Sequence, residues 1–395
     1  MHPSENRHVM KILTVSHFYE DHGGGIERIA AQLCRQFARD GHKPAWAASD
    51  ADPPPRTVTQ AIPLRCVDPI EASTGLPMPI PGPSAVRSLA RAIGNNDFVV
   101  VHDALYLTSV VALILAKMRG KPVVLIQHIA EIPFASNVKR RLMRLANFIV
   151  ARPMMRAADR LVFISSDVRR EMLGDPARRN SMLLYYGVDT SIFHRDDPRN
   201  RCPVRIRHGL PADEKVALFV GRFVEKKGIS VIEAIARHRP DLHIAMVGNG
   251  PVRPESWDLP NVHILGPQSQ QTIAELYGAA DLLLLPSVGE GYPLVIQEAM
   301  ACALPVVCGD QSARADPCAA RWLRGVDINL ADPAGSALRC VTAIDGLDRN
   351  PDDCAEMALY AEKTYSWPTM ARAIVLSLSG SIESAEHATG SCQPV

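Results

Sequence analysis

Two glutamates, Glu290 and Glu298, stand eight residues apart where an apolar run gives way to a helical pattern. The run 282–285 is typical of a buried strand, and Pro293 suits the first position of a helix. Glu290 would then lie in the loop before this helix and Glu298 inside it. Loop amides and a helix N-terminus favour an anion, so the segment predicts an anion site flanked by two carboxylates. Solvated surface glutamates are the alternative.

Two cations follow another strand-like run. Arg222 comes directly after Gly221, which ends the run 217–221, and Lys227 lies in the same loop. Ligands of open α/β sheets bind beyond the carboxyl ends of the strands. An arginine fork and a lysine point charge placed there would neutralise a diphosphate. A solvated basic loop is the alternative reading of this pair.

A third segment has three glycines, including Gly24 and Gly25, between a strand-like run and the predicted helix 26–40. Glycines at this place let the backbone approach a ligand, and the helix N-terminus favours negative charge. The G-x-G-x-x-G spacing of a dinucleotide site is missing, and no Gly-Lys-Ser/Thr follows, as a P-loop requires. A flexible strand-to-helix loop is the alternative.

Three histidines end or follow strand-like runs: His17, His102 and His128. A histidine at such a place is either a satisfied core residue or a residue that reaches a ligand at the sheet edge. The pattern alone leaves both open.

Short apolar runs alternate with helix-like stretches on both sides of a segment rich in proline and charge, residues 196–213. Such runs suit parallel strands that are buried on both faces. Two consecutive arrays predict an α/β fold with two doubly wound domains. The predicted strands are 11–16, 44–49, 98–103, 123–128, 161–165 and 182–188, then 217–221, 243–248, 262–266, 281–287 and 305–308. The predicted organisation is an N-terminal domain at 8–195, a linker at 196–213, a C-terminal domain at 214–365, a helix at 366–380 that packs back on the N-terminal domain, and a disordered tail at 381–395.

The chain has 395 residues, with 43 Lys and Arg against 42 Asp and Glu and a formal net charge of +1. This balance argues against a protein that coats nucleic acid, and we expect no nucleic-acid partner. Nine cysteines, an odd number without a close C-x2-C pair, indicate a reducing compartment. Residues 1–10 lack the apolar core of a signal peptide, and the longest apolar run, within 106–118, is too short to cross a bilayer. We therefore expect a cytoplasmic protein.

These segments, in this order, resemble the retaining, nucleotide-sugar-dependent glycosyltransferases of the large group 1 (family 4) class. Glu290 and Glu298 match the E-x7-E signature of the family, and the resemblance extends from Lys11 to about Leu376. Further matches are Gly221-Arg222, Lys227-Gly228, Gly24-Gly25, Gly187-Val188-Asp189, Gly248-Asn249-Gly250-Pro251 and Ser366-Trp367. The resemblance implies the GT-B fold, in which two Rossmann-like domains face each other across a cleft, the N-terminal one for the acceptor and the C-terminal one for the donor.

The resemblance also implies roles for residues on the donor side. Arg222 and Lys227 would bind the donor diphosphate and stabilise the departing nucleotide, while Glu290 would sit beside the donor sugar. Glu298 would bind the ribose hydroxyls. The remaining donor residues implied by the resemblance are Gly291, Tyr292 and Leu294, through loop amides, and Gly24 and Gly25, which approach the diphosphate from the N-terminal domain.

On the N-terminal side, His128 is the best match to a family histidine near the donor sugar. We expect His17 and His102 to shape the acceptor side. The implied reaction moves a sugar, with retention, from a nucleotide-diphosphate sugar to a hydroxyl of a glycan or lipid-linked acceptor, in bacterial polysaccharide or lipopolysaccharide synthesis. We expect no cofactor and no metal, because fixed cations and amides can stabilise the leaving diphosphate and no Asp-x-Asp motif or histidine cluster is visible.

The sequence departs from the family pattern at three places. Tyr186 stands where the family usually has Asn, Ala303 replaces a usual glycine, and 309–314 lacks a common Gly-Gly pair. These changes keep open a catalytically degenerate scaffold that binds nucleotide or glycan. A sugar-nucleotide epimerase or a phosphorylase would use the same fold, but no phosphate site or pyridoxal-binding lysine of a phosphorylase is apparent.

Between Val138 and Arg160 the chain carries seven basic residues against one acid, Asp159, with apolar residues interleaved. A basic amphipathic helix of this kind lies on anionic membranes. A helix packed on the N-terminal sheet with a solvated basic face explains the pattern equally well. The first reading predicts peripheral association with the inner face of the cell membrane.

Overall fold

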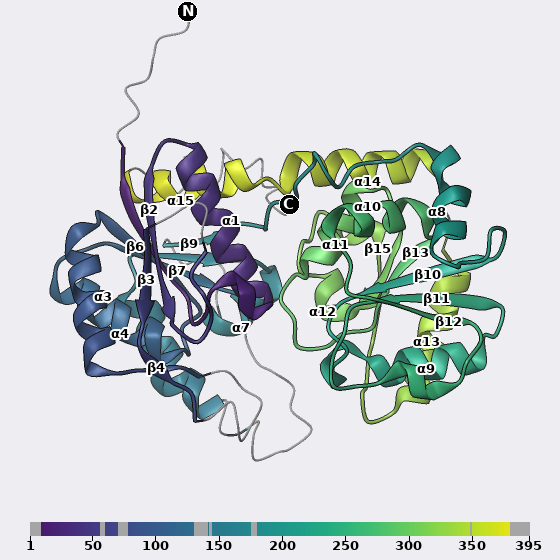
Figure 1. Ribbon diagram of the computed structural model, residues 1–395, viewed down its shortest axis with the longest axis horizontal. Helices are drawn as coiled ribbons and strands as arrows, with labels where there is room; N and C mark the ends of the chain where they lie inside the picture. Colours follow the sequence, from purple (N-terminus) through teal and green to yellow (C-terminus); the bar gives the residue numbers. More distant parts are fainter. Residues whose placement is uncertain are drawn as a thin grey trace, which may run out of the picture.

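The computed structural model describes residues 9–55, 60–69, 78–129, 141, 144–174, 180–347 and 350–379. These residues form two α/β domains side by side, each with its own sheet, joined along one edge by the last two helices (Figure 1). The tail predicted at 381–395 lies outside the described residues.

The N-terminal domain contains a seven-stranded sheet in the order β3-β2-β1-β6-β7-β8-β9. All of its neighbouring strands pair in parallel. Its strands are β1 (Lys11–Val15), β2 (Lys43–Ser49), β3 (Gln60–Leu64), β6 (Phe98–His102), β7 (Val123–Gln127), β8 (Arg160–Phe163) and β9 (Ser181–Leu183), and a small antiparallel ribbon joins β4 (Cys66–Val67) to β5 (Ile80–Pro81). The helices are α1 (Gly25–Arg39), α3 (Pro83–Asn95), α4 (Leu107–Met118), α6 (Arg152–Ala157) and α7 (Ser166–Leu173), with a 3-10 turn η1 (Glu20–His22) and a π-helical turn η2 (Asn147–Ala151).

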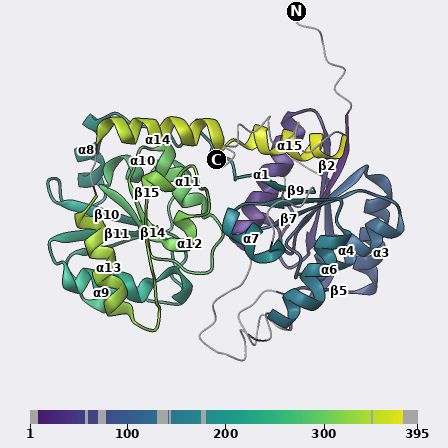
Figure 2. The ribbon, with the colours of Figure 1, turned by 180° about the vertical axis from the view of Figure 1, so that it is seen from behind.

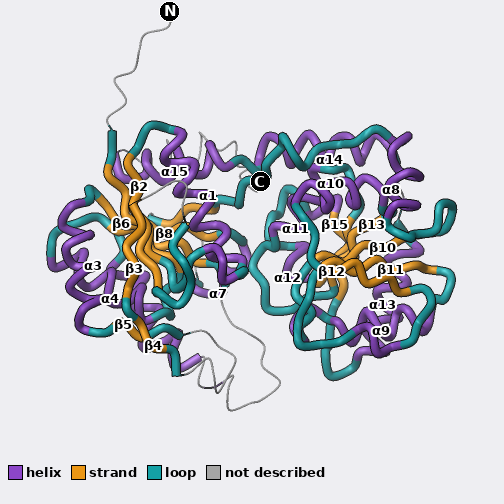
Figure 3. The backbone as a smooth tube through the Cα atoms, viewed as in Figure 1, coloured by secondary structure: helices purple, strands orange, loops and turns teal. Residues whose placement is uncertain are grey.

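The C-terminal domain contains a second, six-stranded parallel sheet in the order β12-β11-β10-β13-β14-β15. The separation of the two sheets is plain in Figure 3. The strands are β10 (Lys215–Val220), β11 (Leu242–Val247), β12 (Val262–Gly266), β13 (Leu282–Leu285), β14 (Val306–Gly309) and β15 (Leu323–Val326). The helices are α8 (Arg201–Arg207), α9 (Ile229–His238), α10 (Gln270–Ala279), α11 (Leu294–Ala301), α12 (Asp310–Ala313), α13 (Pro333–Asp345) and α14 (Pro351–Thr364), with 3-10 turns η3 (Pro198–Asn200), η4 (Glu225–Lys227), η5 (Pro254–Trp257) and η6 (Ala320–Trp322). The last helix, α15 (Trp367–Ser379), follows α14 and returns to the N-terminal domain.

The central strands explain the arrangement of both domains. Strands β6, β7 and β13 are buried along their whole length, as strands covered by helices on both faces must be. Helix α1 buries Ile29, Leu33 and Phe37 against its sheet and exposes the opposite face. The predicted α/β class with two doubly wound domains is confirmed.

Several elements differ from the sequence-based predictions. The last N-terminal strand ends at Leu183, and residues 184–188 continue without strand pairing. Strands β3 and β15 were not predicted. Helix α11 begins at Leu294, one residue after the predicted start at Pro293.

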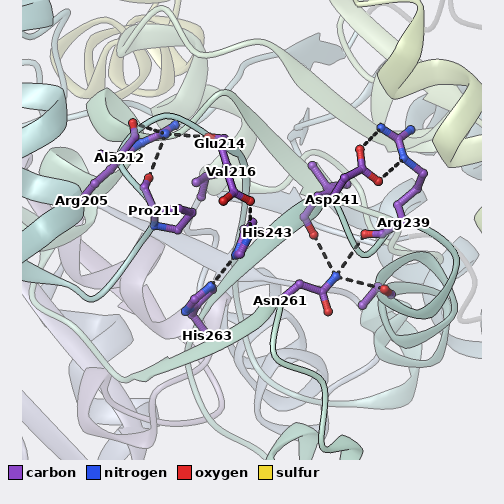
Figure 4. Close-up of polar contacts among 12 residues, drawn as sticks. Arg205, Pro211, Ala212, Glu214, Val216, Arg239, Asp241, His243, Asn261 and His263 are labelled. Atoms are coloured by element: carbon purple, nitrogen blue, oxygen red, sulfur yellow. Dashed lines mark hydrogen bonds and ion pairs between the residues drawn. The ribbon is translucent and has the colours of Figure 1, made fainter.

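The predicted linker 196–213 contains a helix, α8, which is anchored in the C-terminal domain. The guanidinium of Arg205, fully buried, donates to the carbonyls of Pro211, Ala212 and Glu214 at 3.2, 3.0 and 2.7 Å (Figure 4). It also reaches Asp281 at 2.7 Å. These contacts lie at the amino ends of the C-terminal strands, the edge opposite to the one that the sequence motifs occupy.

The chain crosses between the domains twice, and the two crossings touch. The N–H of Val188, on the way out of the N-terminal domain, donates to the carbonyl of Tyr365 at 3.0 Å. A Cβ on Gly187 would lie 2.2 Å from the backbone nitrogen of Trp367, so only glycine fits beside the returning chain. Helix α15 then packs against α1 on the N-terminal domain (Figure 2). None of the helices in the described parts of the chain is long and apolar enough to span a bilayer.

A candidate active site between the two sheets

The carboxyl ends of the two sheets meet at one contact between domains. Gly291, in the loop between β13 and α11, packs against the end of β7: a Cβ there would lie 2.4 Å from the carbonyl oxygen of His128. The same Cβ would lie 2.6 Å from Ile164 Cδ1. The loop that carries Glu290 and the N-terminal strand that carries His128 are therefore in direct contact.

Lys227 and Glu290 form a partly buried ion pair at this place, with side chains that are 16% and 12% exposed. The Nζ of Lys227 lies 2.8 Å from both carboxylate oxygens of Glu290, and the Nζ of Lys226 lies 3.8 Å from Oε1. Burial alone would raise the pKa of Glu290, but the charges of Lys227 and Lys226 outweigh it and hold that pKa below its usual value. Glu290 is thus ionised and is held in place by the loop 222–228, which we call the basic loop.

The basic loop reaches Glu290 because of one glycine. Gly228 has a φ of +70°, and a Cβ there would lie 2.0 Å from the carbonyl oxygen of Pro286. Arg222, after β10, is exposed and has no carboxylate within ion-pair distance among the described residues. Its guanidinium is therefore available to an anion next to the Lys227–Glu290 pair.

Glu298 lies on α11, and few polar groups replace the water that its buried carboxylate loses on folding. The hydroxyl of Tyr277 donates to Oε2 at 3.2 Å. Burial raises the pKa of Glu298 to about 7, against the opposing effects of the Arg28 charge and the Tyr277 hydrogen bond. Arg28 belongs to the first turn of α1, so its charge acts on Glu298 from the other domain.

His102, His128 and Tyr186 form a hydrogen-bonded chain at the ends of the N-terminal strands. His102 Nδ1 and His128 Nε2 are 3.0 Å apart, and His128 Nδ1 lies 2.5 Å from Tyr186 Oη. Burial lowers the pKa of His102 to about 3, and it lowers that of His128 well below the usual value. Both imidazoles are therefore neutral near pH 7, so each ring can donate one hydrogen bond and accept another but carries no charge.

Asp103 joins this edge, although the sequence motifs did not single it out. It has a φ of 62°, unusual for a residue with a side chain, and its Oδ1 accepts from Gln127 Nε2 at 2.5 Å. Its Oδ2 is buried without a hydrogen-bond partner. Burial raises the pKa of Asp103 to about 8. The signal in the sequence was its place directly after His102, at the end of a strand.

Glu27 is a second residue that the motifs missed, and the position of its carboxylate explains why residue 24 is a glycine. His17 Nε2 lies 2.8 Å from Glu27 Oε1, both side chains are buried, and Tyr106 stacks on the His17 ring at 3.8 Å. A Cβ on Gly24 would lie 2.0 Å from Glu27 Oε2, whereas one on Gly25 would meet nothing within 4 Å. Gly24 leaves room for the Glu27 carboxylate, and the residue order Gly-Gly-x-Glu was the available signal.

The loop between β13 and α11, which we call the donor loop after the role that the resemblance implies, buries the side chain of Tyr292 in the core. Tyr292 is buried, and its hydroxyl lies 2.8 Å from that of Tyr365. Leu294 begins α11 and packs against the core. The loop can therefore offer a ligand its backbone amides, as the resemblance implies. Among the described residues, no group of three or more His, Cys, Asp and Glu is placed to hold a metal ion.

A family model of known proteins matches each of the two domains. The model of the family "Glycosyltransferase Family 4" matches residues 23–192, and the model "Glycosyl transferases group 1" matches residues 214–332. The D-inositol 3-phosphate glycosyltransferase of Mycobacterium tuberculosis is 36% identical over 166 residues. That alignment covers 38% of this chain and 34% of the relative, so it spans about a third of the length of the curated relative.

Solved structures match nearly the whole chain at low identity. Sucrose-phosphate synthase from Thermosynechococcus elongatus has a TM-score of 0.68 at 17% identity, over 94% of this chain and 98% of that one. Anabaena Alr3699/HepE in complex with UDP and glucose has a TM-score of 0.67 at 17% identity, over 94% and 99%. WaaG, a glycosyltransferase involved in lipopolysaccharide biosynthesis, has a TM-score of 0.63 at 17% identity, over 96% and 100%. With two family models and these folds in agreement, the chain belongs to the group 1, family 4 glycosyltransferases and has the GT-B fold.

Proposed function

We propose that the protein transfers a sugar from a nucleoside-diphosphate sugar to a hydroxyl group of an acceptor, with retention of the anomeric configuration. The observation that supports this most directly is the partly buried Lys227–Glu290 pair beside Gly291, which packs on His128. This arrangement places a cationic loop, a carboxylate, loop amides and a histidine at one contact between the domains. A solved neighbour, Alr3699/HepE, is described in complex with UDP-glucose.

In the proposed reaction, the bond between the sugar C1 and the diphosphate oxygen breaks, and the acceptor oxygen bonds to C1 on the same face. The leaving phosphate oxygen takes the proton of the acceptor hydroxyl. Arg222, Lys227 and the amides that follow Glu290 would stabilise the charge on the departing nucleotide. Because Lys227 is held by Glu290 and the Arg222 guanidinium is a permanent cation, we propose that the reaction needs no metal and no cofactor.

Glu298 would bind the ribose, and its environment suits that task. A carboxylate with a pKa near 7 gains a hydrogen-bond partner when the ribose hydroxyls arrive. Gly24 and Gly25 would approach the diphosphate from α1. On the N-terminal side, His128 would lie at the donor sugar, with His102 and His17 toward the acceptor. The neutral His102–His128–Tyr186 chain would hold the His128 ring in one orientation.

We further propose that the acceptor is a glycan or a lipid-linked glycan and that the protein binds the inner face of a bacterial cell membrane. Of the segment between Val138 and Arg160, residues 141 and 144–160 are described. Leu145, Phe148 and Ile149 are 52%, 62% and 59% exposed at helical spacing. Met154 and Met155 pack in the core. A solvated basic face does not account for three exposed apolar side chains, which favours membrane contact. The proposed role in polysaccharide or lipopolysaccharide synthesis accords with the fold neighbour WaaG.

The donor assignment is tested by thermal unfolding with UDP, GDP, ADP and their glucose or mannose conjugates, first with EDTA and then with Mg²⁺. A ligand that binds the folded state alone raises the melting temperature by mass action. We expect one nucleotide to raise it without metal, and Arg222→Ala or Glu298→Ala to remove the effect. Arg237→Ala is the matched control, since Arg237 pairs with Glu233 near the end of α9. No shift with any nucleotide would contradict the proposal and favour the degenerate scaffold.

Product analysis then tests the reaction itself. With the nucleotide sugar that binds, we expect sugar release or transfer whose initial product keeps the anomeric configuration of the donor, read by NMR. Glu290→Gln should reduce turnover at least about 100-fold, because Lys227 loses its charged partner and the donor sugar loses a contact. An inverted product, or full turnover in Glu290→Gln, would contradict the mechanism.

Membrane association is tested separately by sedimentation with vesicles that contain anionic phospholipid. The triple variant Leu145→Ser, Phe148→Ser, Ile149→Ser should lose binding at low salt. The control is Leu338→Ser, Leu359→Ser, which removes two apolar side chains of 51% and 49% exposure from the other domain. If wild-type protein ignored anionic vesicles, or if both variants bound equally, this proposal would be wrong.

A further inference from the structure

A buried carboxylate surrounded by tyrosines lies next to the contact between the domains, outside the residues that the mechanism uses. Asp316, 1% exposed, lies between α12 and η6. Its Oδ2 accepts from the hydroxyls of Tyr360 and Tyr365 at 2.8 and 2.9 Å, and its Oδ1 accepts from the N–H of Cys318 at 3.0 Å. We call Asp316 with Tyr185, Tyr292, Tyr360 and Tyr365 the Asp316 cluster.

The cluster extends from Asp316 to the donor loop through one hydroxyl. Tyr365 Oη lies 2.8 Å from Tyr292 Oη, and Tyr292 is the residue after Gly291. Tyr185 stands edge-on to both rings, with ring centroids at 5.7 Å from each. Tyr360 contacts Asp316 and the Tyr365 ring but makes no hydrogen bond to Tyr292 among those described.

Each tyrosine belongs to a different part of the chain. Tyr185 lies on the way out of the N-terminal domain, Tyr292 in the donor loop, Tyr360 in α14, and Tyr365 at the return crossing before α15. Burying a carboxylate is unfavourable unless donors replace its water, and burial raises the pKa of Asp316. A group of this kind adds little net stability, but its directional bonds hold its partners in one geometry.

The neighbours of two cluster tyrosines meet at His128. Tyr186, next to Tyr185, bonds to the His128 ring, while Gly291, next to Tyr292, packs on the His128 carbonyl. A second link lies just before Asp316, where the N–H of Ser166, at the start of α7, donates to the carbonyl of Ala315 at 2.9 Å. The cluster therefore lies beside the contact between the donor loop and the N-terminal strand end that carries His128.

We propose that Asp316 is a positioning residue for the donor loop: through Tyr365 and Tyr292 it holds Gly291 and Glu290 against His128. Asp316 touches no substrate in this proposal. It sets where the sugar lies relative to His128, while Arg222 and Lys227 still bind the diphosphate. The inference rests on the proposed function for its kinetic consequence but not for its structural one.

A pair of tyrosine variants separates positioning from general support. Tyr365→Phe and Tyr360→Phe each remove one hydrogen bond to Asp316, but only Tyr365→Phe breaks the link to Tyr292. Hydrogen–deuterium exchange of the amides in 288–294 reads the loop directly and needs no substrate. We expect exchange to become at least fivefold faster in Tyr365→Phe and in Asp316→Asn, and to change less than twofold in Tyr360→Phe.

Kinetics supplies the functional half of the test, with the nucleoside-diphosphate sugar that raises the melting temperature most. Tyr365→Phe should lower kcat for sugar release at least tenfold while changing KM less than threefold, and Tyr360→Phe should leave both within threefold. Unchanged loop exchange in Tyr365→Phe, or equal effects in the two variants, would overturn the positioning role. Faster loop exchange in a protein that binds no nucleotide would retain the structural role and reject the proposed function instead.

Discussion

Glu298 is buried on α11 with one hydroxyl donor, so its protonation is coupled to folding. Its pKa rises from 4.5 to about 7 on folding because burial disfavours the charged form. The folded state therefore holds the proton more tightly than the unfolded state between these values. The stabilisation is fully present below about pH 4.5 and is lost as the pH rises toward 7.

Glu298→Gln should remove this pH dependence. The measurement is urea unfolding at pH 5 and at pH 8. Between these pH values the free energy of unfolding of wild type should fall by on the order of 2–3 kcal/mol more than that of the variant. Comparing the two proteins at the same pH values cancels the contribution of other buried groups such as Asp103. Parallel pH profiles in the two proteins would show that the Glu298 carboxylate titrates normally.

Residue types and spacing indicated which residues of the C-terminal domain lie at the contact better than they did for the N-terminal domain. Glu290 and Lys227 could be identified because each follows a recognisable strand in its own motif. Tyr186 was visible only as a departure from the family pattern; its hydrogen bond to His128 depends on a chain path that runs past Leu183 without strand pairing. Asp103 and Glu27 were missed because their significance comes from burial, which spacing does not reveal.

At the scale of elements, the loop between β13 and α11 depends on a glycine for its fit. A Cβ on Gly291 would overlap the His128 carbonyl and the Ile164 side chain, and the carbonyl belongs to the backbone of a fully buried strand end. Gly291→Ala must therefore push the loop away from the N-terminal domain. We expect turnover to fall at least about tenfold, since small misplacements of reacting groups are costly. Nucleotide binding should stay within about threefold, because Arg222 and Lys227 belong to another loop.

Gly94→Ala is the matched control for this prediction. Gly94 is exposed near the end of α3, and a Cβ there would meet nothing within 4 Å. Helix propensity alone should then stabilise the variant by about 0.5 kcal/mol, with activity unchanged. Equal activity of Gly291→Ala and Gly94→Ala would contradict the proposed close contact in the working enzyme.

Elements were predictable where the apolar run was long and central, and not where tertiary pairing decided the structure. The runs that became β6, β7 and β13 were found because strands covered on both faces are apolar throughout. Strand β3 was missed because it contains Pro63, which a strand at the edge of a sheet tolerates and the interior of a central strand does not. The glycine that the family usually has at the position of Ala303 has a local explanation: this residue has a φ of 60°, which glycine adopts freely and alanine only with strain.

At the scale of the molecule, α15 is part of the N-terminal domain although it ends the described chain. It buries Met370, Ala371, Ala373 and Ile374, and the carbonyl of Ser377 accepts from Arg160 at 2.6 Å. A chain that ends at Ser366 should lose on the order of 5 kcal/mol of N-terminal-domain stability and about 10 °C in melting temperature. A chain that ends at Ser379 keeps α15 whole and should melt like wild type. Equal melting of both truncated chains would show that α15 does not support the domain.

The two adjacent crossings, at Gly187–Val188 and Tyr365–Trp367, make the C-terminal domain an insertion within the N-terminal one. Because the C-terminal domain is attached at two neighbouring crossings, it can rotate about the line that joins them, while twisting or sliding relative to the N-terminal domain is restricted. The two crossings therefore act together as a hinge. The same topology governs recombination. Exchanging the C-terminal domain with that of a relative requires two cuts, one at each crossing, whereas a single fusion point in the linker would leave α15 of one parent packed on the N-terminal domain of the other.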